Sequence, residues 1–503
     1  MSEVADIDVE LRQPPSLWLS WRGMIVYLCL LCNTCLYLCR TCITVAIVYM
    51  FKDPAQQGIL LSAFYAGYTV SQVPGGWLAK RHGPYAVLSV AVLLWSTVTI
   101  ATIYFGTVPS ILFILRFLVG CAEGVNYPCQ MQLNTNWAPH NERSRTWALG
   151  MAGESIGTIM ALIGGPYLIH EYDSWKAVFV VSGLAGYTWL AIFLLLGSSK
   201  PENHTFISDL ELHYIIQNRN ACSNNEMGNR ISRSINDLHD GAYINLDDES
   251  LPSNGRNSFD GVSKEPPGEG KNRSIVHTPW KRIACNRPFQ VAVITHCCYN
   301  YGYYVVLSWI SDFFKSEFNT DYKSMGFVSI MPFVLLFITN PLGGILGDYF
   351  ENHLGLTTLT MRRIINTVAM GGASVGFLCV GLLAKDATTV EKKESNLYPC
   401  ATVLAVTMAI GGLMSAGVWS NFRDLSSEHA GVLVGISNSV ASLPGIVGQS
   451  MTGLILKWSN NDWFTIFALA AGIELCGCLT FCIGAVSNLR VISKHYRVHW
   501  GHC

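Results

Sequence analysis

The fold is decided by the stretch from residue 23 to residue 48, which reads GMIVYLCLLCNTCLYLCRTCITVAIV and carries Arg40 as its only charged residue. A helix needs about 20 mostly apolar residues to cross the hydrocarbon core of a bilayer. Eleven further stretches along the chain meet the same condition. The twelve predicted spans cover residues 23–48, 57–79, 85–105, 110–136, 145–169, 177–197, 288–314, 324–347, 361–384, 399–421, 431–456 and 463–486.

The composition of the 503-residue chain excludes a soluble protein. Charged residues make up 13% of the chain and apolar residues 50%, whereas soluble domains carry about 25% charged residues. The formal net charge of −1 gives no indication of nucleic-acid binding. Continuous apolar runs far longer than the roughly ten alternating residues of a barrel strand favour helices. We therefore expect an all-α polytopic protein in the lipid bilayer.

Five segments are predicted along the chain. They are a cytoplasmic tail (1–22), a six-helix bundle (23–197), a cytoplasmic and largely disordered linker (198–287), a second six-helix bundle (288–486) and a cytoplasmic tail (487–503). Arginine sets the orientation, because cytoplasmic loops carry an excess of positive charge. With both termini in the cytoplasm, all loop arginines lie inside: Arg81, Arg143, Arg145, Arg362, Arg363, Arg423, Arg490 and Arg497. A plasma membrane and an acidic organelle membrane fit equally well.

The two bundles repeat a motif at corresponding positions. The second span ends in Pro74-Gly-Gly-Trp-Leu-Ala-Lys-Arg81, and the eighth ends in Pro341-Leu-Gly-Gly-Ile-Leu-Gly-Asp348. Similar motifs in two halves of six spans are typical of duplicated transporter folds.

Ionisable residues inside spans are costly, so each is by default a functional candidate. Arg116 and Glu123 are seven residues apart and share one helix face. The acid could neutralise the arginine until an anion or proton intervenes, or the two could form a permanent ion pair that only joins helices. Arg40 has no acid within a turn on its own span, so it needs an anion from another helix or from a solute. Its alternative role is structural.

The remaining buried ionisable residues are less decisive. Glu154 lies in Gly153-Glu-Ser-Ile-Gly157 and could either carry a coupling proton or stay protonated and silent. His296, with Tyr299 and Asn300 one turn on, would line a cavity, or it could be a hydrogen-bonded structural group. Glu474 is interpreted as structural.

No metal site and no cofactor are expected. The cysteines of the first span form a stripe along one helix face, and a single helix cannot bring metal ligands together from several directions. These residues, Cys29, Cys32, Cys35, Cys39 and Cys42, are interpreted as packing residues. The sequence contains no GxxxxGK[ST] nucleotide loop, so an energised process would draw on an ion gradient.

Ordered motifs occur along both halves. They are Arg116-Phe-Leu-Val-Gly-Cys-Ala-Glu-Gly-Val-Asn-Tyr-Pro128, Trp137-Ala-Pro-His-Asn-Glu-Arg-Ser144, Gly67-Tyr-Thr-Val-Ser-Gln-Val-Pro-Gly-Gly76, His296-Cys-Cys-Tyr-Asn300, and Asn421-Phe-Arg-Asp424 with Ala430-Gly-Val-Leu-Val-Gly-Ile-Ser-Asn438. Together they resemble motifs of the anion:cation symporters of the major facilitator superfamily, the group of sialin, vesicular glutamate and sodium/phosphate transporters. The resemblance covers nearly all of the chain outside the tails and the central linker.

The resemblance implies a solute carrier with alternating access around a central anion site. By position, Arg40 matches the arginine that binds the substrate anion, and Arg116 and Glu123 match residues of gating and cation coupling. Tyr68, Tyr299, Asn300 and Asn438 match positions near the central cavity, which His296 is also expected to line. Arg81 and Asp348, with the motif glycines, would latch the cytoplasmic side. The implied partners are a small anionic solute such as phosphate, sialic acid or a glutamate-like anion, and H⁺ or Na⁺; the carrier would be a monomer.

The sequence departs from the family pattern at three positions. Sialin-like members carry an acid where this chain has Val119, bacterial relatives carry Asp at Cys39, and vesicular glutamate and sialin members carry His at Met131. Glu154 is a candidate replacement for the lost acid. The alternatives to a coupled carrier are an uncoupled anion uniporter or exchanger and a non-transporting sensor on the same fold. A membrane enzyme is not expected, because the buried charges lie in mid-span and not at an interface.

Overall fold

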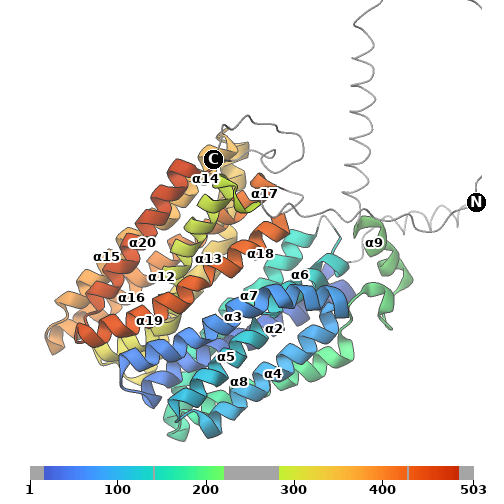
Figure 1. The fold of residues 1–503 in the computed structure, drawn as a ribbon. Coiled ribbons are helices and arrows are strands. Elements are labelled where there is room, and N and C mark those ends of the chain that lie inside the picture. The colour runs from blue at the N-terminus through green and yellow to red at the C-terminus, as the bar shows by residue number, and fades with distance from the viewer. Residues whose placement is uncertain (1–15, 140–141, 220–282, 427–429, 487–503) are drawn as a thin grey trace, which may run out of the picture.

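The computed structural model describes residues 16–139, 142–219, 283–426 and 430–486. These residues form helices joined by short turns, with no strand among them. Figure 1 shows two groups of long helices lying side by side, the N-terminal half in blue to green and the C-terminal half in yellow to red. The prediction of an all-α protein with two helical halves is confirmed.

The N-terminal half begins with the 3-10 turn η1 (Leu17–Leu19). Its helices are α2 (Trp21–Met50), α3 (Pro54–His82), α4 (Pro84–Phe105), α5 (Pro109–Glu123), α6 (Asn126–Trp137), α7 (Arg143–Tyr172) and α8 (Lys176–Leu196). Local sequence explains several of the starts, because the Ser20 and Asp53 side chains accept backbone N–H groups at the first turns of α2 and α3. Proline occupies a first position in α3, α4 and α5, where its missing N–H costs nothing.

The C-terminal half contains more interrupted helices. It comprises α12 (Arg287–Phe318), α13 (Tyr322–Asn352), α14 (Thr358–Asn366), the π-helical turn η4 (Thr367–Gly371), α15 (Gly372–Asp386), α16 (Val390–Gly412), η5 (Leu413–Ser415), α17 (Val418–Leu425), α18 (Ala430–Ala441), α19 (Leu443–Trp458) and α20 (Trp463–Gly484). Because α14, η4 and α15 follow one another without a gap, they lie within one of the predicted spans.

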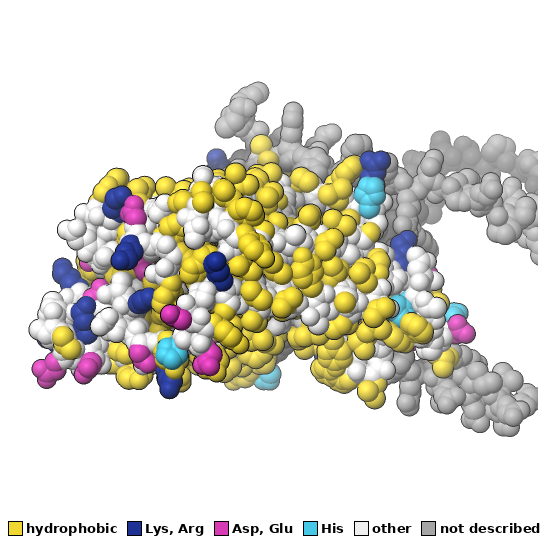
Figure 2. Space-filling model, turned by 90° about the horizontal axis from the view of Figure 1, so that it is seen from below, with side chains coloured by type: hydrophobic (Ala, Val, Ile, Leu, Met, Phe, Trp, Pro, Cys, Tyr) yellow, Lys and Arg dark blue, Asp and Glu magenta, His cyan; other side chains and the backbone are white. Residues whose placement is uncertain are grey.

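Ten helices in the described part of the chain are long and apolar enough to cross a membrane. The ten do not include α3 and α12, although these are 29 and 32 residues long. Both helices bury polar side chains between the halves, among them Gln57, Gln72 and Asn300, which lowers their hydropathy. The total of twelve spans therefore stays a prediction. Figure 2 shows a broad hydrophobic surface, with charged side chains gathered toward the two ends of the visible face, as expected for a protein in lipid.

The start of the predicted linker contains ordered structure. After α8 come the 3-10 turn η2 (Pro201–Asn203) and the helix α9 (Asp209–Arg219), which lies at one end of the N-terminal half (Figure 1). The Glu211 carboxylate accepts the backbone N–H groups of Trp21 and Arg22 at 3.1 and 2.8 Å, so α9 caps the first turn of α2. Residues 220–282 lie outside the described residues.

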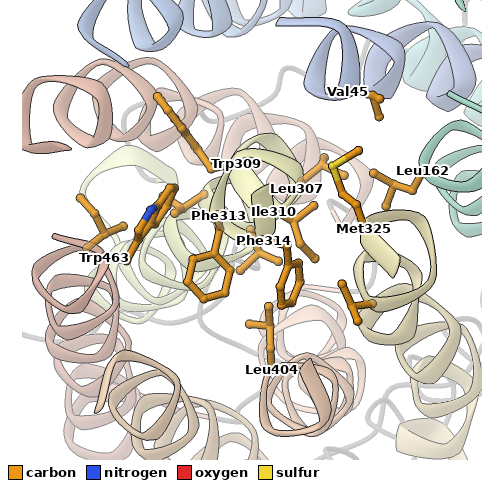
Figure 3. Packing of buried hydrophobic residues seen from close by; sticks show 14 of the residues in the cluster. Val45, Leu162, Leu307, Trp309, Ile310, Phe313, Phe314, Met325, Leu404 and Trp463 are labelled. Atoms are coloured by element: carbon orange, nitrogen blue, oxygen red, sulfur yellow. The ribbon is translucent and has the colours of Figure 1, made fainter. Parts of the chain in front are cut away.

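The two halves meet along α3 and α19, α7 and α13, and α2 and α12. Figure 3 shows Leu307 and Met325 of the C-terminal half pointing toward Val45 and Leu162 of the N-terminal half. All four side chains are buried in one apolar cluster that continues into the core around Phe313. An apolar contact therefore joins the halves near their middle.

The closest approach of the halves occurs where α3 begins, which we call the Asp53 end. A Cβ atom added at Gly58 would lie 2.5 Å from the Gln449 carbonyl oxygen, and one at Gly453 would lie 2.3 Å from the Pro54 carbonyl oxygen. Glycine is therefore required on both helices at this crossing. The Asp53 end is closed by small residues in direct backbone contact.

Candidate functional site

Arg40 of α2 lies between the halves and is paired with an acid from another helix. Its Nε is 3.1 Å from Oε2 of Glu123, at the last turn of α5, and the two side chains are 7% and 0% exposed. Three aromatic rings surround the guanidinium, those of Tyr37, Phe64 and Tyr68, with centroids 4.6–4.9 Å from its central carbon. Cation–π contacts are strongest when desolvated, so a ring cage and one carboxylate hold this charge.

Arg116 lies earlier on α5 than Glu123, on the same helix face, and its surroundings are different. It is 0% exposed, and none of its three guanidinium nitrogens has a hydrogen-bond acceptor among the described residues. Its one ring contact is with Phe179 of α8, at 5.8 Å. The ion pair between Arg116 and Glu123 that their shared helix face suggested is therefore wrong, because Glu123 turns to Arg40.

Arg116 has no hydrogen-bonded counter-ion among the described residues, although its charge acts on the Glu123 carboxylate from a longer distance. Cys39 lies near Arg116, but its thiol is uncharged and donates to the Ser182 carbonyl oxygen at 3.3 Å. The neighbouring Cys42 thiol donates to the carbonyl oxygen of Cys39. These thiols fill space in the α2–α8 contact, in line with their interpretation as packing residues.

A small cavity lies between the halves, beside both arginines, and its accessible volume of about 20 Å³ is enough for about one water molecule. Side chains from both halves line it: Arg40, Ile43, Thr44, Leu61, Phe64, Tyr65, Arg116, Leu307 and Ser308. Two of the nine are guanidinium groups, so the cavity presents positive charge at the centre of the molecule.

Glu154 of α7 belongs to a second group, on the other side of Arg40. Its carboxylate accepts the hydroxyl of Tyr127, and Tyr37 lies beside it. Glu154, in the middle of α7, and Tyr127, in the first turn of α6, keep part of their surface accessible, and so do Tyr299 and Tyr303 of α12. Tyr299 and Tyr303 stack with ring centroids 6.3 Å apart. This group is therefore not completely enclosed by the protein.

The structure brings together four of the predicted site residues, Arg40, Arg116, Glu123 and Tyr68. Of two more, Asn438 lies at the contact between the halves, and Asn300 bonds within the C-terminal half. Asn438 of α18 donates its amide to Oε1 of Gln72 at 3.1 Å, and Asn300 donates to the Ala441 carbonyl oxygen at 2.9 Å.

His296 lies elsewhere, inside the C-terminal half. Its Nδ1 is 2.9 Å from the Ser437 hydroxyl, and its ring packs edge-on against Trp419 at 4.6 Å. It does not line the cavity beside the arginines. Glu474, interpreted as structural, is 2% exposed and lies near Gly302 of α12, where its Oε1 would be 2.9 Å from an added Cβ.

The residues predicted to latch one end are only partly visible. The Arg81 guanidinium lies over the Trp77 ring at 5.1 Å, and Arg81 is exposed. The Asp348 side chain lies outside the described part of the structure. The latch therefore stays a prediction.

Several residues around the site were not predicted from the sequence. Tyr37 and Thr44 lie three residues before and four residues after Arg40, and Tyr65 lies three residues before Tyr68. Helical spacing places such neighbours on the face of the candidate residue, so this signal was available for them. Nothing local points to Leu307 or Ser308, which come from the other half.

Comparisons with known proteins agree with the motifs. The family model described as Major Facilitator Superfamily matches residues 29–449. Sialin of Ovis aries is 26% identical over 451 residues, covering 88% of this chain and 78% of sialin. The sodium-dependent phosphate transport protein 1, chloroplastic, of Arabidopsis thaliana is 26% identical over 485 residues, covering 93% of this chain and 81% of that protein.

A solved structure has the same fold at lower identity. The crystal structure of a D-xylose-proton symporter superposes with a TM-score of 0.64 at 11% identity, covering 94% of this chain and 99% of the other. At that identity the likeness concerns the arrangement of the helices and not the solute. Because the family model spans most of the chain, the chain belongs to the Major Facilitator Superfamily, and within it the chain is similar to sialin and to a sodium-dependent phosphate transport protein.

Proposed function

We propose that the protein is a secondary active transporter of a small anion, coupled to H⁺ or Na⁺ and working by alternating access. The observation that carries this proposal is Arg116, a fully buried guanidinium beside a cavity with no acceptor among the described residues. A buried charge without a partner is expensive in a membrane protein. Its retention is explained when the partner is an anion that arrives from solution.

The names of the relatives support an anionic solute. Sialin and the sodium-dependent phosphate transport protein each align over most of their own length. Phosphate is an anion, and the second name states dependence on sodium. Phosphate, sialic acid and glutamate-like anions are therefore the first solutes to test.

The distribution of contacts between the halves supports alternating access. Along α3, contacts with the C-terminal half run from Asp53, which is paired with Lys457 at 2.9 Å, to Gln72. Beyond Gln72, the neighbours of Gly75 and Gly76 are Val125 and Pro128 of the same half, and Trp77 is 57% exposed. The halves thus hold together at the Asp53 end and have fewer ties at the opposite end.

We assign the less closed end to the cytoplasm, where the arginine rule places Arg81. The partial exposure of Glu154 and Tyr303 in mid-helix is compatible with a site that is open toward that side. In the opposite state, the crossing of Gly58 and Gly453 separates and the Arg81 end closes. The motif around Arg81 and Asp348 is the proposed latch of that second state.

Coupling is assigned to Glu123 and Glu154. Glu123 neutralises Arg40 when no solute is bound, and a solute anion that approaches either arginine competes with this carboxylate. Glu154 shares a hydrogen bond with Tyr127 next to the solvent-exposed side, where a proton can enter. Protonation of Glu154 leaves the site positive, so it favours the anion in the state that faces the proton source.

The remaining predicted residues have positioning roles in this scheme. Tyr68 holds the Arg40 guanidinium against its ring, and Asn300 and Asn438 join α12 and α18 to the site and to α3. Tyr299 stacks on Tyr303 at the exposed side of the site. His296 acts from a distance, through the packing of α12 against α17 and α18.

The test is uptake into proteoliposomes that contain the purified protein. Labelled phosphate, glutamate and sialic acid are supplied with an imposed proton or sodium gradient. We expect one of these gradients to drive accumulation of at least one anion above its outside concentration, and we expect Arg116→Met to abolish this accumulation. The matched control is Arg145→Met, because Arg145 is exposed and lies over the Trp18 ring at 5.5 Å.

Three outcomes would contradict the proposal. Equilibration without accumulation under either gradient would indicate an uncoupled uniporter or exchanger. Binding without entry would indicate a sensor. Accumulation that is equally fast in the Arg116→Met and Arg145→Met variants would remove Arg116 from the site.

A further inference from the structure

The face of α3 that meets the C-terminal half carries three contacts at intervals of seven residues. Gly58, Tyr65 and Gln72 follow one another at two helical turns, so they share one side of the helix. Gly58 and Tyr65 contact α19, and Gln72 contacts α18. Figure 1 shows α3 and α19 lying side by side. Tyr65 is therefore the midpoint of the contact that α3 makes with the other half.

The Tyr65 ring lies in a socket that the C-terminal half provides. A Cβ atom added at Gly445 of α19 would lie 2.3 to 2.8 Å from three atoms of this ring, so the ring lies directly against the α19 backbone. The Tyr304 ring of α12 lies 4.6 Å away between centroids, and the Ser308 hydroxyl lies 3.4 Å from the Tyr65 hydroxyl. Gly445, Tyr304 and Ser308 form what we call the Tyr65 socket, and Tyr65 within it is 3% exposed.

The Tyr65 socket holds the ring mainly by contacts that have no preferred angle. The distance between the two hydroxyl groups exceeds the common O–H···O distance of about 2.7–2.8 Å, so their hydrogen bond is weak. Burial and dispersion supply the remaining attraction, and both depend on contact and not on direction. Because Gly445 has no side chain, the ring meets a flat stretch of backbone. The ring can therefore turn against α19 while the contact persists.

The contacts on either side of Tyr65 are less tolerant of movement. Toward the Asp53 end, the glycine crossing is a backbone contact that exists only when α3 and α19 are close. Toward the other end, Thr69 donates to the Ser442 hydroxyl at 2.9 Å and Gln72 accepts the Asn438 amide at 3.1 Å. Such hydrogen bonds need their two atoms within about 3.2 Å. A tilt of α3 therefore changes the contacts on both sides and preserves the one in the middle.

We propose that Tyr65 is the positioning residue on which the two halves turn, with its ring in the socket in both states while α3 tilts against α19. Opening of the Asp53 end then closes the Arg81 end, because the two ends lie on opposite sides of one pivot. Tyr65 also lies beside Arg40 and Arg116, so the anion site is at the level of the pivot and is reached from either end. This inference rests on the proposed alternating access and assigns its pivot.

Helix geometry gives the size of the expected movements. A Cβ atom at Gly453 would lie 2.3 Å from the Pro54 carbonyl oxygen, whereas ordinary contact begins at 3.4 Å, so Gly453→Ala has to open the crossing by about 1 Å. Pro54 lies eleven residues before Tyr65, about 16 Å along α3, and Lys80 lies fifteen residues after it, about 22 Å along α3. A rigid tilt about Tyr65 therefore brings the Arg81 end together by about 1.5 Å.

The test measures distances between nitroxide labels in the purified protein in nanodiscs, by double electron–electron resonance. The labels are attached to p-acetylphenylalanine, so the 17 cysteines stay unlabelled. One label pair, at Lys52 and Trp458, reports on the Asp53 end, and a second, at Lys80 and Gly435, reports on the Arg81 end. All four positions are exposed.

The substitution Gly453→Ala acts as a wedge at the Asp53 end. We expect it to lengthen the distance at that end by at least about 1 Å and to shorten the distance at the Arg81 end by about 1.5 Å. The matched control is Gly472→Ala in α20, where an added Cβ meets no atom within 4 Å. This control should change neither distance.

Two variants of the pivot separate its role from ordinary packing. Tyr65→Phe keeps the ring, so Gly453→Ala in this background should still move the two ends in opposite directions. Tyr65→Ala empties the socket, so the same wedge should open the Asp53 end without closing the Arg81 end. A tyrosine that only fills space would lower the melting temperature when truncated and leave the opposite movements intact.

Three results would overturn the inference. They are an unchanged distance at the Asp53 end in Gly453→Ala, longer distances at both ends, and opposite movements that survive Tyr65→Ala. The uptake experiment decides the proposed function separately. Opposite movements without gradient-driven accumulation would retain the pivot and refute coupled transport, whereas accumulation together with any of the three results would retain transport and remove the pivot.

Discussion

Replacement of Arg116 by methionine should make the protein more stable in anion-free buffer while it removes anion binding. The side chain is 0% exposed, and its three nitrogens have no acceptor among the described residues. A buried polar group without a partner costs about 1–3 kcal/mol, and a charged one costs more. Methionine fills a similar length without charge, and Glu123 retains Arg40 as its partner. We therefore expect a gain of at least about 1–3 kcal/mol.

Anion binding has the opposite effect on this stability difference, because it stabilises the wild-type protein alone. At an anion concentration one hundred times Kd, binding to the native state stabilises the wild-type protein by about 2.7 kcal/mol, whereas the variant should gain nothing. The difference in stability between the Arg116→Met variant and the wild-type protein should therefore become smaller or change sign as anion is added.

The assay is thermal unfolding of the purified protein in nanodiscs, followed by tryptophan fluorescence over a series of phosphate, glutamate and sialic acid concentrations. Arg145→Met is the control, because this exposed arginine should leave both the anion-free stability and the anion response unchanged. The reasoning would be refuted if Arg116→Met melted below the wild type without anion, or if it kept the wild-type rise in melting temperature with anion. Either result would mean that Arg116 has a permanent partner.

Three further predictions concern the buried pair and the contact between the halves. Glu123→Gln should destabilise the protein by about 3–5 kcal/mol because it leaves Arg40 buried without a carboxylate, and the added substitution Arg40→Leu should restore part of the melting temperature. Gly453→Ala should push α19 away from a backbone carbonyl of α3 that would lie 2.3 Å from the new Cβ, so spin labels on the two helices at the Asp53 end should report longer distances; unchanged distances would argue against a tight crossing. The hydrogen bond from Lys457 holds the pKa of Asp53 below its usual range, so their attraction is complete above the ordinary pKa of Asp and is lost as pH falls through the lowered one. Because both side chains are about half exposed, the loss should be below about 1 kcal/mol, and the same label pair should show only a small opening in acid that disappears in Asp53→Asn.

Much of the fold can be predicted from the length of the apolar stretches in the sequence. The predicted span 463–486 corresponds to α20 at Trp463–Gly484, and the predicted span 177–197 to α8 at Lys176–Leu196. Hydropathy finds such helices because each crosses the bilayer without interruption. It says less about breaks inside a span, such as the π-helical turn at Thr367–Gly371 or the interruption before α17 at Gly417, where φ is −84° and ψ is −104°. Those breaks depend on tertiary packing that a window average does not contain.

The candidate site shows the same division between local and distant information. Mid-span charge marks Arg40, Arg116 and Glu123 as candidates, and the structure places Arg40 beside Glu123 and both arginines at one cavity. Periodicity on one helix predicts only which residues share a face. It assigns the wrong partner to Glu123, because the choice between an arginine seven residues away and one 83 residues away depends on how α2 packs against α5. The mid-span position of His296 predicts a place in the site, but in the structure the side chain contacts the Ser437 hydroxyl.

One position links these observations. Cys39 stands where the resembled family has an aspartate in bacterial relatives, and it lies near Arg116. With Glu154 protonated, an aspartate there would give the second arginine its own carboxylate, and the two arginines and two acids would cancel. With cysteine, whose thiol is engaged by the Ser182 carbonyl oxygen, one positive charge is left over, and it lies beside the cavity. The uncharged residue at position 39 therefore leaves one positive charge that an anion from outside can balance when Glu154 carries its proton, so protonation and anion binding favour each other at this site.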